Sequence, residues 1–130
     1  MSRTSTIGHP ASAGTFVRDV ERFADFGQPS ARTTNVVAGQ RVPVFTNEFW
    51  TSKQRAAHSL HEISYRACFK PQLPRFFIER LSQPGDAVFD PFMGRGTTLL
   101  EAALLDRTPW GCDLNPLCTA LVRPRLTPPT

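Results

Sequence analysis

The segment 87–98 constrains the fold of this chain more than any other part of the sequence. It begins with a short apolar run that is typical of a buried parallel strand. Gly94 and Gly96 then allow sharp turns of the backbone and the close approach of a ligand, which a Cβ atom would block. Thr97 and Thr98 open a helix whose free N–H groups point into the same crevice. The segment therefore predicts a strand, a ligand-binding loop and a helix.

Two acidic residues indicate which ligand this loop binds. Asp113 ends a second apolar run, 109–112, and a carboxylate there can accept both hydroxyls of a ribose. Asp90 precedes the first glycine, and Leu99 stands where a dinucleotide fingerprint has its third glycine. A carboxylate at the position of Asp90 would repel a pyrophosphate but attract the ammonium and sulfonium groups of S-adenosyl-L-methionine (AdoMet). At an effective dielectric near 20, a charge pair about 4 Å apart contributes roughly 4 kcal/mol, so the pattern favours AdoMet.

Three segments carry a resemblance to a known family. Residues 90–105 followed by 109–116 resemble the DPF-x-G-x-GTT loop and the acidic strand end of the N-4 cytosine and N-6 adenine DNA methyltransferases. Residues 64–74 resemble motif X of that family, which closes the methionine end of the pocket. The resemblance covers roughly residues 58–126. It implies an α/β fold, namely a partial Rossmann-like methyltransferase fold with parallel strands, flanking helices and a helical N-terminal extension.

The resemblance also implies a set of cofactor contacts. The loop residues would line the methionine and ribose side, the two threonines the carboxylate end, and the second strand end the ribose and adenine. The implied AdoMet-binding residues are Tyr65, Phe69, Lys70, Asp90, Pro91, Phe92, Gly94, Gly96, Thr97, Thr98, Asp113 and Asn115. Arg95 replaces the serine that is common at its place, and we expect its side chain to point outward.

The family's catalytic tetrapeptide is absent from this sequence. It consists of Asp, Asn or Ser, then Pro-Pro, then an aromatic residue that stacks on the flipped base. Residues 127–130 contain Pro-Pro but lack both the acceptor and the ring, so no catalytic residue is assigned. We therefore expect the AdoMet-binding part of an enzyme that methylates cytosine or adenine in double-stranded DNA, either truncated or completed by a second polypeptide. The alternative is a stand-alone AdoMet-binding module or an inactive remnant.

Upstream of the resemblance the signals are local. Residues 1–14 are small and polar, which predicts disorder. Apolar residues spaced along 16–26 predict an amphipathic helix that ends at Gly27. Residues 30–40 are predicted to be a linker, 42–45 an edge strand, and Thr46 or Asn47 the cap of a helix running toward His58. These signals predict a flexible segment over 1–40 with one helix, and the AdoMet-binding part over 41–130.

The remaining elements follow from proline, glycine and apolar spacing. A short helix and a loop are predicted over 59–73, and a helix from Pro74 to about Ser82. Two further helices are predicted, one from Thr97 or Thr98 to about Leu105 and one that Asn115 opens and Pro124 stops.

Composition sets broad limits on partners. The net charge of +4 permits a polyanionic partner but does not require one. Arginine outnumbers lysine 13 to 2, which suits phosphate binding but also arises from genomic composition. The basic side chains over 66–80 either contact DNA phosphates or form an exposed helix face; they are Arg66, Lys70, Arg75 and Arg80.

Cysteine and histidine usage argues against several classes of site. The three cysteines show no CxxC spacing, and Cys112 and Cys118 are predicted to be core residues. His58 and His61 are too few for a zinc site, so no metal is expected. We expect the two histidines to be solvated or to cap a helix. No leader and no apolar run of about 20 residues is present. We expect a soluble cytoplasmic protein with reduced thiols and no membrane partner.

Overall fold

The computed structural model describes residues 13–51, 58–63 and 68–127. The chain forms two compact units, Met1–Thr51 and Ser52–Thr130. Residues 1–12, where disorder is predicted, lie outside the described residues, as do Arg66 and the predicted motif X contact Tyr65. Residues 13 and 14, also predicted to be disordered, are helical, so that part of the prediction was wrong. No described helix is long and apolar enough to cross a membrane.

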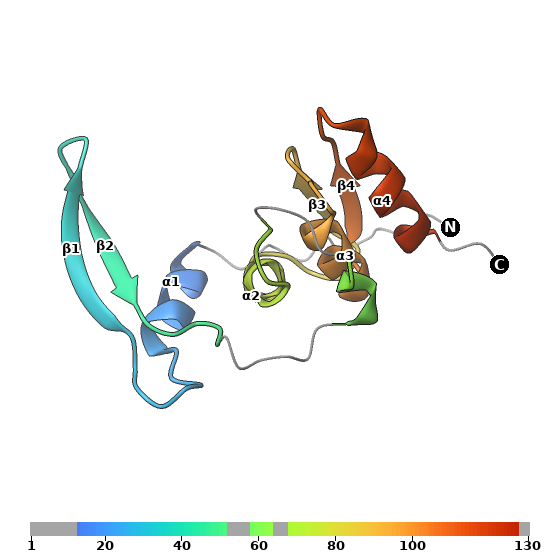
Figure 1. Ribbon diagram of the computed structural model, residues 1–130. Helices are drawn as coiled ribbons and strands as arrows, with labels where there is room; N and C mark the ends of the chain where they lie inside the picture. Colours follow the sequence, from blue (N-terminus) through green and yellow to red (C-terminus); the bar gives the residue numbers. More distant parts are fainter. Residues whose placement is uncertain (1–12, 52–57, 64–67, 128–130) are drawn as a thin grey trace, which may run out of the picture. The chain divides into compact units, whose positions relative to one another are not determined.

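The first unit is a helix beside a β-hairpin (Figure 1). Helix α1 (Ala13–Arg22) buries Val20, and Phe23 after it lies 5.2 Å from the ring of Phe49. Strands β1 (Ala31–Val37) and β2 (Gln40–Thr46) pair antiparallel. The turn between them has positive φ at both positions, which is the geometry that a two-residue hairpin requires.

Three predictions for this unit were wrong. The predicted linker over 30–40 contains β1, and its residues are all exposed, so no alternation of apolar and polar residues marked the strand. The helix after Thr46 is absent from 47–51, because the Asn47 side chain donates instead to the carbonyls of Phe23 and Gln28. The amphipathic helix exists but ends at Arg22.

The second unit contains the predicted strand–helix–strand order. Strands β3 (Ala87–Asp90) and β4 (Thr108–Gly111) are parallel, and α3 (Thr97–Leu104) connects them. Leu99, Leu100 and Ala102 on α3 are at most 3% exposed. The parallel strands and flanking helices confirm the predicted α/β class (Figure 1).

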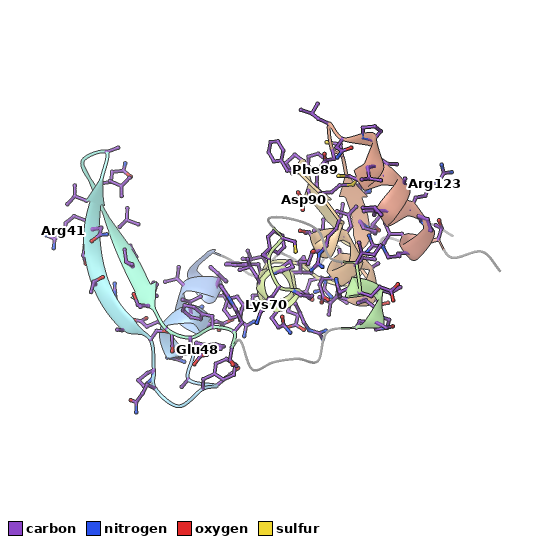
Figure 2. All side chains as sticks on the ribbon, viewed as in Figure 1. Arg41, Glu48, Lys70, Phe89, Asp90 and Arg123 are labelled. Carbon is purple, nitrogen blue, oxygen red and sulfur yellow. The ribbon has the colours of Figure 1, made fainter. Side chains whose placement is uncertain are left out.

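In the described part of this unit, the other face of the small sheet is exposed at Phe89 and Trp110, and we call it the bare face. Phe89 and Trp110 pair across β3 and β4, and 62% and 63% of their surfaces are exposed. A Cβ on the next residue, Gly111, would meet the Leu99 side chain, so the two aromatic rings lie on the face opposite α3. Figure 2 labels Phe89 and Asp90, the last two residues of β3.

Two helices complete the described part of this unit, together with the 3-10 turn η1 (Ser59–His61). Helix α2 (Gln72–Leu81) packs on α3 and begins two residues before the predicted Pro74, which lies in its first turn. Helix α4 (Pro116–Leu126) buries Cys118, as predicted. Cys112 is not a core residue; it is exposed just after β4.

The prediction that Pro124 stops α4 was wrong, because the helix continues to Leu126. Proline lacks the N–H that would bond to the carbonyl of Ala120, and its ring crowds that carbonyl. The next turn is held by other contacts: Arg125 Nε donates to the Leu121 carbonyl, and Leu126 packs against the core of this unit. Packing at the end of the helix outweighs the lost hydrogen bond.

Candidate functional site

The loop between β3 and α3 forms the floor of the candidate site. Asp90 ends β3, and its Oδ1 accepts a hydrogen bond from the backbone N–H of Phe92 at 2.9 Å. Gly94 and Gly96 both have positive φ, at 50° and 82°. A Cβ on Gly96 would lie 2.4 Å from Val122 Cγ2, so this glycine allows α4 to pack against the loop. The sequence predicted the sharp turn but not this contact.

Asp113 joins the second strand end to the loop. Its Oδ2 accepts the Gly94 N–H at 2.9 Å, and its Oδ1 accepts the Asn115 N–H at 2.9 Å. These backbone hydrogen bonds, with that from Asn115 the larger cause, lower the pKa of the Asp113 carboxyl. The carboxylate is therefore ionised at neutral pH, and it lies directly against the glycine loop that follows Asp90.

The aromatic residues expected at the methionine end are also brought together. Phe69 lies beside the loop, and with Phe92 and Gly94 it lines a small hollow, which Cys68, Met93, Arg95 and Thr97 complete. Phe92 is 83% exposed and Phe69 is 43% exposed, so both rings are accessible. A contact between these residues and a cofactor remains a prediction.

The other predicted contact residues differ in their surroundings. Thr97 is buried, and its hydroxyl accepts from Arg95 Nε at 3.0 Å. Asn115 is exposed and caps α4, because its Oδ1 accepts the Leu117 N–H at 3.1 Å. The remaining three lie at the surface or half-buried around the loop: Lys70, Pro91 and Thr98.

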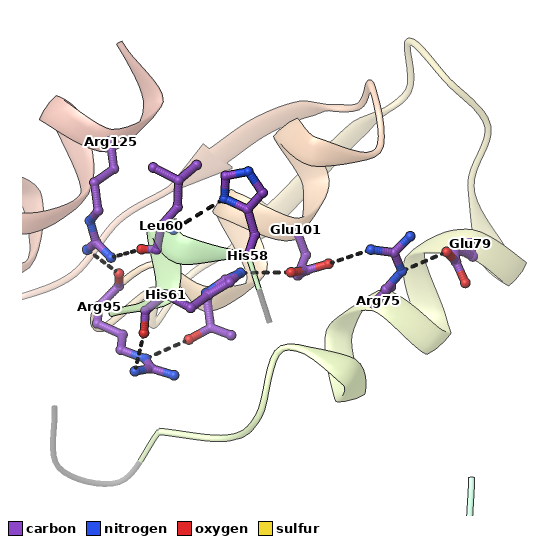
Figure 3. Close-up of polar contacts among 9 residues, drawn as sticks. His58, Leu60, His61, Arg75, Glu79, Arg95, Glu101 and Arg125 are labelled. Atoms are coloured by element: carbon purple, nitrogen blue, oxygen red, sulfur yellow. Dashed lines mark hydrogen bonds and ion pairs between the residues drawn. The ribbon is translucent and has the colours of Figure 1, made fainter. Parts of the chain in front are cut away.

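Arg95 does not point outward as predicted. Its Nη1 donates to the Ile63 carbonyl at 2.6 Å and to the His61 carbonyl at 3.4 Å (Figure 3). The segment 58–63 offers backbone carbonyls near the loop, and a buried carbonyl needs a donor. Nothing in the local sequence indicated this contact, because its partners lie more than thirty positions upstream.

A buried contact between a histidine and a glutamate was also missed. His61 Nε2 lies 2.7 Å from Glu101 Oε1, and both side chains are 3% exposed. His58 has the predicted capping role, because its Nδ1 accepts the Leu60 N–H at 3.2 Å. Across residues 13–51, 58–63 and 68–127, no cluster of three or more His, Cys, Asp or Glu residues could hold a metal.

The basic helix face is largely engaged within the protein. Arg75 Nε lies 2.9 Å from Glu79, and its Nη1 lies 3.7 Å from Glu101 (Figure 3). The Arg80 guanidinium stacks over the Phe76 ring, 3.9 Å from its centroid. For these two arginines, the contacts within α2 and α3 favour a structural role over phosphate binding.

Comparison with known families identifies the chain. The family model described as DNA methylase matches residues 27–122. The chain belongs to the DNA methylase family. This confirms the family that the glycine loop and the acidic strand end predicted.

Individual relatives match shorter parts of this DNA methylase chain. The Type II methyltransferase M.MjaII of Methanocaldococcus jannaschii is 39% identical over 67 residues, which are 51% of this chain and 12% of the relative. The Type II methyltransferase M.MvaI of Kocuria varians is 35% identical over 81 residues, or 60% of this chain and 17% of the relative. The chain thus spans less than a fifth of the length of these two relatives.

A solved structure also matches in part. The crystal structure of the M1.HpyAVI–SAM complex shares 31% sequence identity with this chain, with a TM-score of 0.44. The match covers 47% of this chain and 30% of that one.

Proposed function

We propose that this chain is the AdoMet-binding portion of a site-specific DNA methyltransferase that modifies the exocyclic amino group of cytosine or adenine. The observation that carries the proposal is the hydrogen bond between Asp113 Oδ2 and the Gly94 N–H. It joins Asp113, which follows β4 by two residues, to the glycine loop that follows Asp90. Membership of the DNA methylase family supports this assignment.

The charged and polar groups of AdoMet would each meet a complementary group of this chain. Ionised Asp113 would accept the ribose hydroxyls, and Asp90 would attract the ammonium and sulfonium groups. The N-terminus of α3 at Thr97 and Thr98 would favour the carboxylate. Aromatic and polar residues around the loop would complete the pocket: Tyr65, Phe69, Lys70, Pro91, Phe92, Gly94, Gly96 and Asn115.

AdoMet, when bound, supplies an electrophilic methyl group. The residues of this chain would contribute to the reaction by binding and orientation, which lower the entropic part of the barrier. The ionised carboxylate of Asp113 would hold the ribose, and the loop backbone would set where the sulfonium lies. No residue of this chain is assigned to hold the target amino group.

The groups that position the target base would be supplied by a longer chain or by a second polypeptide. That polypeptide would also contact the double-stranded DNA. Two observations support this. The sequence lacks a Pro-Pro-aromatic tetrapeptide, and the bare face formed by Phe89 and Trp110 offers apolar surface for further elements to cover. A coding frame for such a tetrapeptide, continuous with or adjacent to this one, would strengthen the proposal.

Calorimetric titration of the purified chain with AdoMet tests the pocket. We expect measurable binding by the wild type and an affinity at least about tenfold lower for Asp113→Ala, because the ribose loses its acceptor. Asp19→Ala, which removes an exposed carboxylate of the first unit, is the matched control and should bind like the wild type. Absence of binding by the wild type would overturn the proposed function.

Catalysis is tested separately. Methyl transfer from labelled AdoMet to DNA should require the polypeptide that carries the missing tetrapeptide, and the chain alone should show none. Efficient methylation of DNA by the chain alone would contradict the division of roles proposed above.

A further inference from the structure

The guanidinium of Arg125 connects three separate segments of the second unit. From α4, its Nε donates to the Leu121 carbonyl at 2.7 Å. Its Nη1 donates to the Leu60 carbonyl at 3.0 Å and its Nη2 to the Arg95 carbonyl at 2.7 Å (Figure 3). One rigid fork thus holds its own helix, the segment 58–63 and the glycine loop, which the single ammonium of a lysine cannot do with the same geometry.

Arg95, in the glycine loop, contacts both Arg125 and the segment 58–63. Its backbone carbonyl accepts from Arg125, while its side chain donates to the carbonyls of His61 and Ile63. The two arginines therefore hold the segment 58–63 from both sides. We call this pair, Arg95 and Arg125, the arginine clasp.

The clasp places two like charges near each other in a half-buried position. Burial, and secondarily the charge of Arg95, lowers the pKa of the Arg125 guanidinium. Backbone carbonyls supply the acceptors that offset this cost. Packing alone does not require a like-charged pair, and the carbonyl that Arg125 reaches is that of the glycine loop.

The loop is held from both of its flanks. Asp113 accepts the Gly94 N–H on one side, and Arg125 donates to the Arg95 carbonyl on the other. Val122 of α4 also lies against Gly96, where no Cβ would fit. Two nearby peptide groups of the loop, 93–94 and 95–96, are thus fixed by an acceptor after β4 and by a donor from α4.

We propose that Arg125 and Arg95 are positioning residues that set the conformation of the loop 93–96 and couple it to the segment 58–63. Phe69 lines the hollow beside the same loop. The consequence for the cofactor rests on the proposed function: the clasp acts on the methionine end, whereas Asp113 holds the ribose. The coupling itself does not depend on any ligand.

Hydrogen exchange of the full chain without ligand tests the coupling. In Arg125→Lys we expect amide exchange to rise about tenfold or more in both 58–63 and 93–97, with little change in β3, since local opening frees both segments. Arg123→Lys, on an exposed position of the same helix, is the matched control and should exchange like the wild type. Unchanged protection of 93–97 in Arg125→Lys would overturn the proposal.

A second variant covers the case in which Arg125→Lys does not fold. Arg95→Gln keeps the carbonyl that Arg125 binds but removes the guanidinium contacts to His61 and Ile63. Exchange should then rise in 58–63 more than in 93–97. Protection of 58–63 equal to that of the wild type would also overturn the clasp.

Ligand affinity distinguishes positioning from general stability. Arg125→Lys should weaken AdoMet binding about tenfold, or about 1.4 kcal/mol, while adenosine, which lacks the methionine part, should bind within about twofold of the wild type. An equal loss for both ligands would overturn the positioning role. If the wild type does not bind AdoMet, the proposed function fails, and hydrogen exchange alone decides on the clasp.

Discussion

The two faces of the β3–β4 sheet differ in exposure: apolar side chains are buried on one face and exposed on the other. On one face, Leu99 of α3 lies against Gly111 of β4 and is 3% exposed. On the other, Phe89 and Trp110 lie opposite each other across the strands, 62% and 63% exposed. Both faces are apolar, so composition does not explain the difference; the position of the connecting helix does.

A single crossover helix can cover only one face of a parallel sheet, and such sheets are ordinarily covered on both. The covered face is complete, and the glycine loop at its end is held by Asp113 and Arg125. The bare face has the character of a surface that further elements bury.

The largest effect on the free energy of unfolding is expected for α3, the helix that packs on the sheet. Leu100→Ala should lower the free energy of unfolding by about 3 kcal/mol, because Leu100 is almost fully buried and the change leaves a cavity. Leu114→Ala, at a fully exposed leucine, should change it by less than about 0.5 kcal/mol. Denaturant unfolding measures both, and similar values for the two variants would contradict the comparison.

The next effect concerns the contact of α4 with the loop. Gly96→Ala should destabilise the fold by about 1–3 kcal/mol more than Gly85→Ala, because a Cβ at 96 meets Val122 at 2.4 Å. The two glycines have similar positive φ, at 82° and 89°, so backbone strain cancels in the comparison. Thermal unfolding of the two variants checks this, and equal losses would show that Val122 moves aside freely.

A smaller effect on stability is expected on the bare face. The double change Phe89→Ser and Trp110→Ser should alter the free energy of unfolding by less than about 1 kcal/mol, because neither ring is buried in the chain alone. It should reduce self-association, which light scattering measures. A loss comparable to that of Leu100→Ala would mean that the bare face is covered in solution.

The smallest effect concerns pH. The pKa of Asp113 is lowered in the folded chain by hydrogen bonds from the backbone of Asn115 and Gly94. A lowered folded pKa contributes stability above the ordinary value of 3.8, and this contribution is lost as the pH falls through the folded pKa. Asp113→Asn should therefore flatten the decline of Tm below about pH 4. An identical acid profile in the wild type and the variant would argue against ionised Asp113 as the link between loop and strand end.

Much of the second unit could be predicted because its signals are local. Helix α3 starts at Thr97, one of the two predicted positions, and β3 ends at Asp90, directly before the loop. Glycine, threonine and a terminal acid each restrict the backbone where they stand. Strand β2 contains the predicted edge strand over 42–45, but β1, and with it the hairpin, was missed because β1 is exposed along its whole length and shows no alternation.

The missed contacts of the candidate site join distant positions. His61 meets Glu101 across 40 residues, and Arg125 meets Leu60 across 65. A buried histidine and a solvated one have the same sequence signal, as do an inward and an outward arginine. Only the packing of α3, α4 and the segment 58–63 against one another decides between them.

The sequence by itself determined the family, the strand–loop–helix order around 87–98 and the two acidic strand ends, because these depend on residues that act within a few positions of themselves. The tertiary structure decided that Asp113 binds the loop through Gly94, that Arg95 turns inward, and that one face of the sheet stays bare. Each of these depends on which surfaces meet. A donor and an acceptor that lie far apart in the chain find each other only when the core brings their backbones together.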